Sequence, residues 1–225
     1  MTKQVGLPED AFGLGCAIGD VNGDRLPDIF IAHCNRLFLS RDGKYHEPQE
    51  LRETFAWEPE DNEDWPCGAA FGDLNRDGRL DLVLSIHHER ARNKVFLNEG
   101  IRDGVPHFRD VTIAVGLPKR LNQKAPHMEI RDFDNDGWPD LYACNFTEPN
   151  ALYRNEGDGT FADATAHAGV AAAHIDGFIT FVLDYDNDGA LDLFVGNWSQ
   201  YETVLADRTA GRLTSERDRP ALYRN

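Results

Sequence analysis

Four copies of an acidic nonapeptide place oxygen-bearing side chains at the same offsets along this chain of 225 residues. Positions 1, 3, 5 and 9 of every copy are Asp or Asn, and position 6 is Gly in three of the four copies. Oxygen ligands at such spacings in a tight loop suit a hard cation such as Ca²⁺. The sequence therefore predicts four calcium loops, numbered 1 to 4 along the chain. Their metal-binding residues are Asp20, Asn22, Asp24 and Asp28 in loop 1, Asp73, Asn75, Asp77 and Asp81 in loop 2, Asp132, Asp134, Asp136 and Asp140 in loop 3, and Asp184, Asp186, Asp188 and Asp192 in loop 4.

The alternative to a metal site is an ordinary acidic turn, because Asp, Asn and Gly are common turn residues. The repetition weakens this alternative, since the copies start 53, 59 and 52 residues apart. Several like charges in one loop repel each other unless a cation neutralises them. Four such loops at nearly regular intervals therefore favour metal binding.

An EF-hand shares the opening of the motif, but it requires a bidentate Glu at position 12 and a helix on each side. Position 12 is apolar in every copy here, as Ile31, Leu84, Ala143 and Val195. The ninth-position Asp leads directly into a short apolar run of the kind that forms a buried strand. We therefore expect each loop to join two strands, with the ninth-position Asp completing the coordination shell.

The segments on either side of each loop have the pattern of strands. Residues two and four positions before the first Asp are mostly apolar, which is the period expected of a strand with one face more buried than the other. A third apolar run follows each loop. A glycine turn and a fourth short strand come next, most clearly at Phe108–Thr112 and Phe161–Thr165. Each repeat unit thus has about four antiparallel strands.

Repeats of this size and strand number are typical of propeller blades, which must stack on their neighbours to bury both faces. The absence of a 3.6-residue period excludes a helical solenoid. The predicted fold class is all-β, a β-propeller of four-stranded antiparallel blades with about four blades present. The repeat units span approximately residues 8–50, 66–115, 125–170 and 176–225 of a single propeller region, 1–225.

The loops, the Phe71-Gly72 pair before loop 2 and the segment Leu152-Tyr-Arg-Asn-Glu-Gly-Asp-Gly-Thr-Phe161 resemble the FG-GAP/VCBS repeats of integrin-α-like β-propellers. The most similar branch is the one found with ASPIC/UnbV domains and in cartilage acidic protein. The resemblance implies a calcium-stabilised propeller, usually of seven blades, that serves adhesion or binding outside the cytoplasm. It also implies a further ligand, the backbone carbonyl of position 7, which belongs to Leu26, Arg79, Trp138 and Ala190 in the four loops.

Loop 1 departs from the repeat, with Arg25 at position 6 and Gly23 two residues earlier. Position 6 favours a residue that adopts positive φ, so the turn geometry of loop 1 is an open question at this point. Loops 3 and 4 carry four Asp each, whereas loops 1 and 2 carry three Asp and one Asn. Because calcium affinity rises with ligand charge, we expect loops 3 and 4 to bind most tightly and loop 1 most weakly.

The formal net charge of −16 argues against nucleic acid or an anionic membrane as a partner. Fourteen Asp lie in the four loops, so four bound Ca²⁺ ions would halve the net charge to −8. An ion that binds only the folded chain stabilises it by mass action. We therefore expect the stability of the fold to depend strongly on calcium.

The two ends of the chain do not coincide with the ends of a blade. Thr2–Leu7 aligns with Thr112–Leu117 and Thr165–Val170, where a fourth strand finishes, and Asn225 lies where a third strand finishes. We expect the last blade to lack its outer strand and the chain to be part of a larger, seven-bladed propeller, with a closed ring of four blades as the alternative. Open blade faces would favour self-association.

No apolar segment follows the first four residues and no run approaches membrane-spanning length, so neither an export signal nor membrane insertion is visible. Because calcium loops of this type generally function outside the cytoplasm, we expect an extracellular or periplasmic location. Cys16, Cys34, Cys67 and Cys144 are compatible with two disulfides or with four small buried side chains.

Catalysis finds no support, because nucleophile elbow, zinc-protease and phosphate-loop motifs are all missing. We expect no enzymatic activity, no catalytic residue and no cofactor besides Ca²⁺. The leading hypothesis is a non-enzymatic scaffold that presents loops to a protein partner. Two irregular insertions, 50–65 and 199–219, are the places where partner contacts are expected. Phe55, Trp57 and Trp65 lie in the first as candidate exposed anchors, with packing of the two Trp onto the adjoining blade as the alternative. A carbohydrate-binding propeller, or an accessory domain of a polysaccharide-active enzyme, is the alternative.

Overall fold

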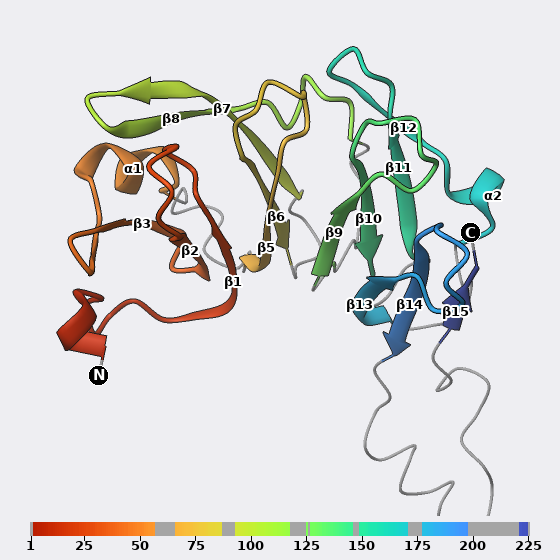
Figure 1. Ribbon diagram of the computed structural model, residues 1–225, viewed down its shortest axis with the longest axis horizontal. Helices are drawn as coiled ribbons and strands as arrows, with labels where there is room; N and C mark the ends of the chain where they lie inside the picture. The colour runs from red at the N-terminus through yellow and green to blue at the C-terminus, as the bar shows by residue number, and fades with distance from the viewer. Residues whose placement is uncertain are drawn as a thin grey trace, which may run out of the picture.

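Four small antiparallel sheets are arranged as the blades of a β-propeller, as the sequence predicts (Figure 1). The structure is a computed structural model that describes residues 2–56, 66–86, 93–117, 125, 127–145, 149–170, 177–197 and 221–224. Three blades have four strands, and the last has three within these described residues. An outer strand of the last blade, which the sequence predicts to be missing, is not among them.

The strands follow one another in chain order across each sheet. Blade 1 contains β1 (Gly13–Gly19), β2 (Asp28–His33), β3 (Arg36–Arg41) and β4 (Lys44–His46). Blade 2 contains β5 (Pro66–Gly72), β6 (Asp81–Ile86), β7 (Lys94–Arg102) and β8 (Val105–Asp110). Blade 3 contains β9 (His127–Arg131), β10 (Asp140–Cys144), β11 (Ala151–Asn155) and β12 (Phe161–Asp163). Blade 4 contains β13 (Gly177–Leu183), β14 (Asp192–Asn197) and β15 (Ala221–Tyr223).

Three short helical elements, η1 (Thr2–Val5), α1 (Gln49–Thr54) and α2 (Thr165–Ala168), accompany the sheets. The described ranges contain no helix that is long and apolar enough to cross a membrane. The fourth strands end earlier than predicted, because Thr112 and Thr165 turn the chain inward. The Oγ1 atom of each Thr accepts a hydrogen bond, 3.0 Å long, from the backbone N–H of Val95 or Leu152 in the preceding strand.

The innermost strands hold the blades together. β1 contacts β5, β5 contacts β9, and β9 contacts β13. Figure 1 shows these strands near the centre of the molecule, with β3, β8, β12 and β15 toward the outside. Blades 1 and 4 are therefore the two ends of the series.

The hydrophobic core lies between the blades. All six residues of β6 are buried, with Leu82 and Leu84 in the cluster shared with blade 1 and Val83 in the cluster shared with blade 3. Leu141 and Tyr153 of blade 3 belong to the same cluster as Val83. Fully burying one such side chain contributes about 1.5–3 kcal/mol, so stacking on both sides stabilises a sheet that would be marginal alone.

Two glycines allow neighbouring blades to approach each other closely. A Cβ atom on Gly72 of blade 2 would lie 2.7 Å from Cγ2 of Ile130 in blade 3. A Cβ atom on Gly19 of blade 1 would lie 2.6 Å from Cδ1 of Leu80 in the turn of blade 2. A glycine directly before loops 1 and 2 is thus required by packing rather than by the turn itself.

The outer faces of the two end blades expose large apolar side chains. Leu14 and Ile18 of blade 1 are 64% and 63% exposed, and Phe181 of blade 4 is 55% exposed. Among the described residues, these side chains of blades 1 and 4 are therefore not buried between blades. Self-association and the total number of blades stay predictions.

Phe55 corrects one expectation about the first insertion. Phe55 follows helix α1 and is only 2% exposed. The centroid of its ring lies 5.2 Å from the ring centroids of Phe30 and Phe96 and 5.3 Å from that of Phe108. It is therefore a core residue between blades 1 and 2 and cannot contact a partner. Trp57, Trp65 and the insertion 199–219 lie outside the described residues.

Candidate metal centres

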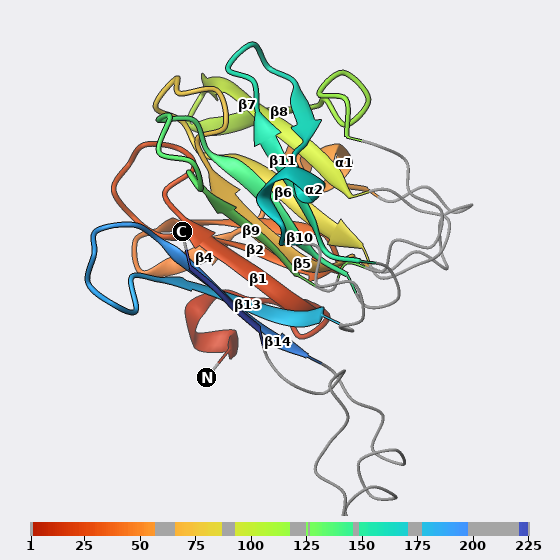
Figure 2. The same ribbon diagram turned by 90° about the vertical axis from the view of Figure 1, so that its right-hand side faces the viewer.

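Each acidic nonapeptide forms the turn between the first two strands of its blade. Figure 2 shows the β1–β2, β5–β6, β9–β10 and β13–β14 turns on the same side of the molecule. The common placement follows from the repeat, because each blade begins with the same antiparallel hairpin. The sixteen predicted ligand residues therefore lie in four equivalent turns along one rim.

The backbone of the four turns is nearly the same. Position 4 has positive φ in every loop, at Gly23 (75°), Arg76 (58°), Asn135 (59°) and Asn187 (59°). Position 6 also has positive φ, at Arg25 (68°), Gly78 (84°), Gly137 (91°) and Gly189 (90°). Loop 1 thus adopts the common turn although it has Arg at position 6. The left-handed conformation costs a residue with a Cβ atom about 1–2 kcal/mol, and each loop has one such residue, which lies at position 6 in loop 1 and at position 4 in the other three.

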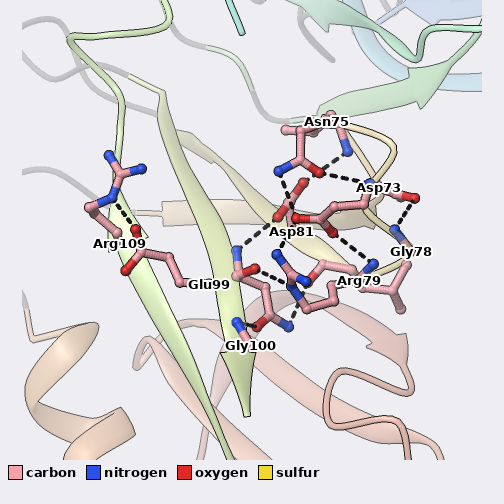
Figure 3. Close-up of polar contacts among 12 residues, drawn as sticks. Asp73, Asn75, Gly78, Arg79, Asp81, Glu99, Gly100 and Arg109 are labelled. Atoms are coloured by element: carbon pink, nitrogen blue, oxygen red, sulfur yellow. Dashed lines mark hydrogen bonds and ion pairs between the residues drawn. The ribbon is translucent and has the colours of Figure 1, made fainter.

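The first-position carboxylate organises each turn through backbone N–H groups. In loop 2, Asp73 accepts hydrogen bonds of 2.9 Å from the N–H groups of Asp77 and Gly78 (Figure 3). Equivalent pairs of bonds, 2.8 to 3.1 Å long, reach Asp20, Asp132 and Asp184. The fifth-position Asp in turn accepts a bond from the N–H of position 7 in all four loops. The turns are therefore formed by their own side chains.

Three carboxylates converge in loops 3 and 4. Oxygen atoms of Asp132, Asp134 and Asp136 lie within 4.8 Å of one another, as do those of Asp184, Asp186 and Asp188. In loop 2, position 3 is Asn75, whose Nδ2 atom donates to Asp77 over 2.8 Å (Figure 3), and loop 1 has the same contact between Asn22 and Asp24. The all-oxygen clusters of loops 3 and 4 fit a hard divalent cation, and the Asn-containing loops have one negative charge fewer.

The ninth-position Asp has a different environment from the other three. Asp28, Asp81, Asp140 and Asp192 are at most 1% exposed. One carboxylate oxygen of each accepts a bond of 2.9 to 3.0 Å from the N–H of position 2 in the same loop. The other oxygen of the first three accepts a bond of 2.8 Å from the third strand, at Ser40, Asn98 and Asn155. This Asp therefore ties the loop to its blade; its predicted role as a metal ligand stays a prediction.

Burial also changes the acidity of this residue. Desolvation raises the pKa of Asp28, Asp81 and Asp140 to about 6, although the two backbone N–H bonds to each carboxylate oppose the rise. The nearby loop carboxylates contribute in the same direction as desolvation. A cation in the loop would offset this repulsion.

Basic side chains already approach three of the loops. The Arg79 guanidinium contacts Asp77 within loop 2. In loop 4, Arg224 lies 2.7 Å from Asp186 and 3.1 Å from Asp188. The Ala190 N–H and the Arg224 guanidinium together hold the pKa of Asp188 below its ordinary value. At loop 3, Arg154 interacts electrostatically with Asp134 and Asp136, and the Arg76 guanidinium lies 5.2 Å from the centroid of the Trp138 ring.

Two buried asparagines that the sequence reasoning missed connect loops 1 and 2 to the next blade. Asn98 of blade 2 donates from Nδ2 to the carbonyl of Val21 in loop 1, over 2.9 Å. Asn155 of blade 3 donates to the carbonyl of Leu74 in loop 2, over 2.8 Å. Both residues occur in the same Asn-Glu-Gly context after the third apolar run. That repeated Asn was the available signal, and its role requires the tertiary structure.

Comparison with known proteins agrees with the repeat structure. The family model for the FG-GAP-like repeat matches residues 20–84 and 132–195, which is more than half of the chain. Cartilage acidic protein 1 from Xenopus tropicalis is 35% identical over 222 residues, covering 89% of this chain and 33% of that protein. The human and mouse proteins of the same name are 33% and 31% identical over 96 residues, covering 43% of this chain and 14% and 15% of those proteins.

The chain thus spans a third or less of the length of these curated relatives. Both matched segments begin at the first Asp of a loop, in blades 1 and 3, and each runs into the second strand of the following blade. The matched segments and the observed blades therefore describe the same repeat. On these grounds the chain belongs to the FG-GAP-like repeat family.

Proposed function

We propose that this chain is a calcium-binding propeller that acts outside the cytoplasm, in an extracellular or periplasmic setting, as a non-enzymatic scaffold for a protein partner. The observation that carries the proposal is the convergence of three carboxylates in loops 3 and 4, within a turn that all four loops share. Uncompensated carboxylates at such distances repel each other, and a divalent cation would remove the repulsion.

The residues that would hold calcium are the side chains at positions 1, 3 and 5 of each loop. Calcium would supply positive charge at the rim, and this role would require no catalytic chemistry of the ion. The ninth-position Asp connects loops 1, 2 and 3 to the third strand, and Asn98 and Asn155 connect loops 1 and 2 to the next blade. Ordering a loop would therefore also stabilise the contact between neighbouring blades.

The setting outside the cytoplasm and the interaction role are supported by similarity and by charge. The relatives carry the name cartilage acidic protein, and this chain is itself acidic, with a formal net charge of −16. The family match supports a binding rather than an enzymatic role. The sugar-binding alternative depended on the aromatic residues of the first insertion; Phe55 is buried, and the two Trp lie outside the described residues, so no observation favours it.

Calorimetric titration with CaCl₂ tests the proposal. Asp136→Asn removes one charge from loop 3, Asp24→Asn makes the matched change in loop 1, and Asp103→Asn is the control. Asp103 is an acidic residue in the β7–β8 turn with a φ of 51°, a conformation that Asn tolerates. We expect Asp136→Asn to remove one of the tightest sites, Asp24→Asn to remove a weaker one, and the control to leave the isotherm unchanged.

Two results would count against the proposal. Absence of calcium binding by the unmodified chain would remove its basis. Equal loss of affinity in Asp136→Asn and Asp103→Asn would show that the measured binding reflects the overall negative charge and not the loops.

A further inference from the structure

A cation–π contact joins loop 2 to loop 3. The guanidinium carbon of Arg76, at position 4 of loop 2, lies 5.2 Å from the ring centroid of Trp138, at position 7 of loop 3. The guanidinium also borders the backbone of loop 3, because a Cβ atom on Gly137 would lie 3.2 Å from Nη1 of Arg76. The indole in turn borders the turn between β11 and β12, where a Cβ atom on Gly157 would lie 2.9 Å from Nε1 of Trp138. Residues 137 and 138 of loop 3 are therefore packed against both loop 2 and their own blade.

Arg76 occupies a backbone position that does not favour arginine. Its φ is 58°, and the equivalent residues of loops 1, 3 and 4 are Gly23, Asn135 and Asn187, which adopt the left-handed region more readily. A residue held in this region against its preference points to a functional constraint. Among the described residues, a Cβ atom on Gly23 would meet no atom of loop 2 within 4 Å, so loop 1 has no equivalent of this contact.

A buried amide provides a second connection between the same two loops. The Nδ2 atom of Asn155, a residue only 2% exposed, donates to the carbonyl of Leu74 over 2.8 Å and to the carbonyl of Pro139 over 3.0 Å. These carbonyls belong to position 2 of loop 2 and position 8 of loop 3. The backbone N–H of Asn155 also donates to Asp140, the ninth-position residue of loop 3. A change in the backbone of one loop would therefore disturb groups that hold the other.

We propose that Arg76 is a positioning residue that couples calcium binding at loops 2 and 3, so that an ion in one loop raises the affinity of the other. The inference rests on the proposed calcium-binding function. Asn155 would keep the two loops at a constant spacing, and Arg76 would transmit the ordering of one loop to the other.

The order of residues in the two loops explains how the coupling would work. Arg76 lies between Asn75 and Asp77, at positions 3 and 5, so an ion held by these residues would order the backbone that carries Arg76. Its guanidinium contacts Trp138, whose N–H donates over 2.8 Å to Asp136, the fifth-position carboxylate of loop 3. Loop 3 would then need less ordering in order to bind its own ion.

Direct repulsion between the two ions acts in the opposite direction. An ion in one loop reduces the attraction of the neighbouring loop for a second ion, which would make the second binding step weaker. Salt screens such long-range effects, with a Debye length of about 8 Å at 0.15 M and about 3 Å at 1 M, whereas partly buried contacts are screened much less. Positive coupling that persists in 1 M KCl would therefore come from the contacts between the loops.

Calorimetric titration with CaCl₂ in 1 M KCl measures the coupling in a background with two active loops. Asp24→Asn and Asp188→Asn disable loops 1 and 4 in every protein, so that binding reports on loops 2 and 3. Asp77→Asn then disables loop 2, and we expect it to lower the calcium affinity of loop 3 by about fivefold or more. Because a coupling free energy is reciprocal, Asp136→Asn in loop 3 should weaken loop 2 by the same factor.

Two further variants test whether the contact between Arg76 and Trp138 carries the coupling. Arg76→Asn and Trp138→Leu each introduce the residue type that another loop has at the same position, as Asn135 at position 4 and Leu26 at position 7. We expect each variant, and the two combined, to reduce the coupling factor by about twofold to fivefold, as for loss of one exposed cation–π contact. Arg25→Asn is the matched control, because Arg25 also has positive φ but lies in the disabled loop 1.

The outcomes separate failure of the coupling from failure of calcium binding. Equal affinity of loop 3 with loop 2 active or disabled would overturn the coupling alone, as would weaker binding at loop 3 when loop 2 is active. A coupling factor that Arg76→Asn reduces no more than Arg25→Asn does would overturn the role of Arg76. Absence of calcium binding by the unmodified chain would overturn the proposed function and the coupling together.

Discussion

Replacing Asn98 by Ala tests how a loop is connected to the neighbouring blade. The side chain of Asn98 is fully buried and donates to the carbonyls of Val21 and Leu80 over 2.9 and 3.3 Å. Its Oδ1 atom accepts a bond of 3.1 Å from the N–H of Gly100. The substitution would leave all three backbone groups without these partners, while the backbone N–H bond of residue 98 to Asp81 would remain.

At about 1 kcal/mol for each lost hydrogen bond, Asn98→Ala should lower the free energy of unfolding by about 3 kcal/mol. A chain of this size loses about 2–4 °C in melting temperature for each kcal/mol, so we expect a decrease of about 6–12 °C. Asn98→Asp should be at least as destabilising, because a carboxylate would face two carbonyl oxygens in a buried site.

Thermal unfolding followed by circular dichroism, in saturating CaCl₂, gives the measurement. Glu99→Ala is the control, since Glu99 is the next residue along β7 and its ion pair with Arg109 is solvent-exposed. We expect the control to change the melting temperature by no more than about 2 °C, because a solvent-exposed ion pair contributes little to stability. Equal melting temperatures for Asn98→Ala and Glu99→Ala would refute the reasoning that Asn98 joins the two blades.

Three further predictions concern a strained residue, a competing cation and the cysteines. Arg25→Gly should stabilise the chain by about 0.5–1 kcal/mol in thermal unfolding, because Gly adopts the positive φ of position 6 without the Cβ penalty; an unchanged or lower melting temperature would contradict this. Arg224→Gln should strengthen calcium binding at loop 4 by up to about fivefold in a calorimetric titration, because the guanidinium competes with the ion. Arg109→Gln, which removes an exposed guanidinium that pairs with Glu99, should not, and the same effect in both variants would contradict the competition. Burial raises the pKa of Cys67 to about 11 and that of Cys144 to about 12, so at pH 8 native-state alkylation followed by mass spectrometry should modify the exposed Cys16 first; modification of Cys144 at the same rate would contradict its burial.

The repeat made the fold and the positions of the four acidic turns predictable from the sequence. Strand periodicity and four regularly spaced loops depend only on residues that are close together in the chain, and local patterns of this kind determine the hairpins. The four cysteines are free thiols, but only Cys144 is the small buried side chain that the alternative to disulfides expected; Cys16 is exposed and Cys34 and Cys67 are half-buried.

Features that depend on distant contacts were not predictable. Asn98 and Asn155 contact residues 77 and 81 positions earlier in the chain, and no local pattern identifies such a partner. The sequence indicated Phe55 as a candidate surface anchor. Its burial could not be predicted, because it depends on contacts with three aromatic residues from blades 1 and 2. The turn of loop 1 was left open by the Arg at position 6, and the hydrogen bonds to Asp20 explain why it keeps the common geometry.

Thermal unfolding of the unmodified chain in saturating CaCl₂ and in EDTA tests most directly whether calcium in the four loops stabilises the blades. One site at a calcium concentration of about 100 times its dissociation constant contributes about 2.7 kcal/mol, so each occupied loop should raise the melting temperature by about 5 °C or more. The melting temperature should therefore be clearly higher in calcium, and Asp136→Asn should lose part of the increase. The same melting temperature in both buffers would contradict the account.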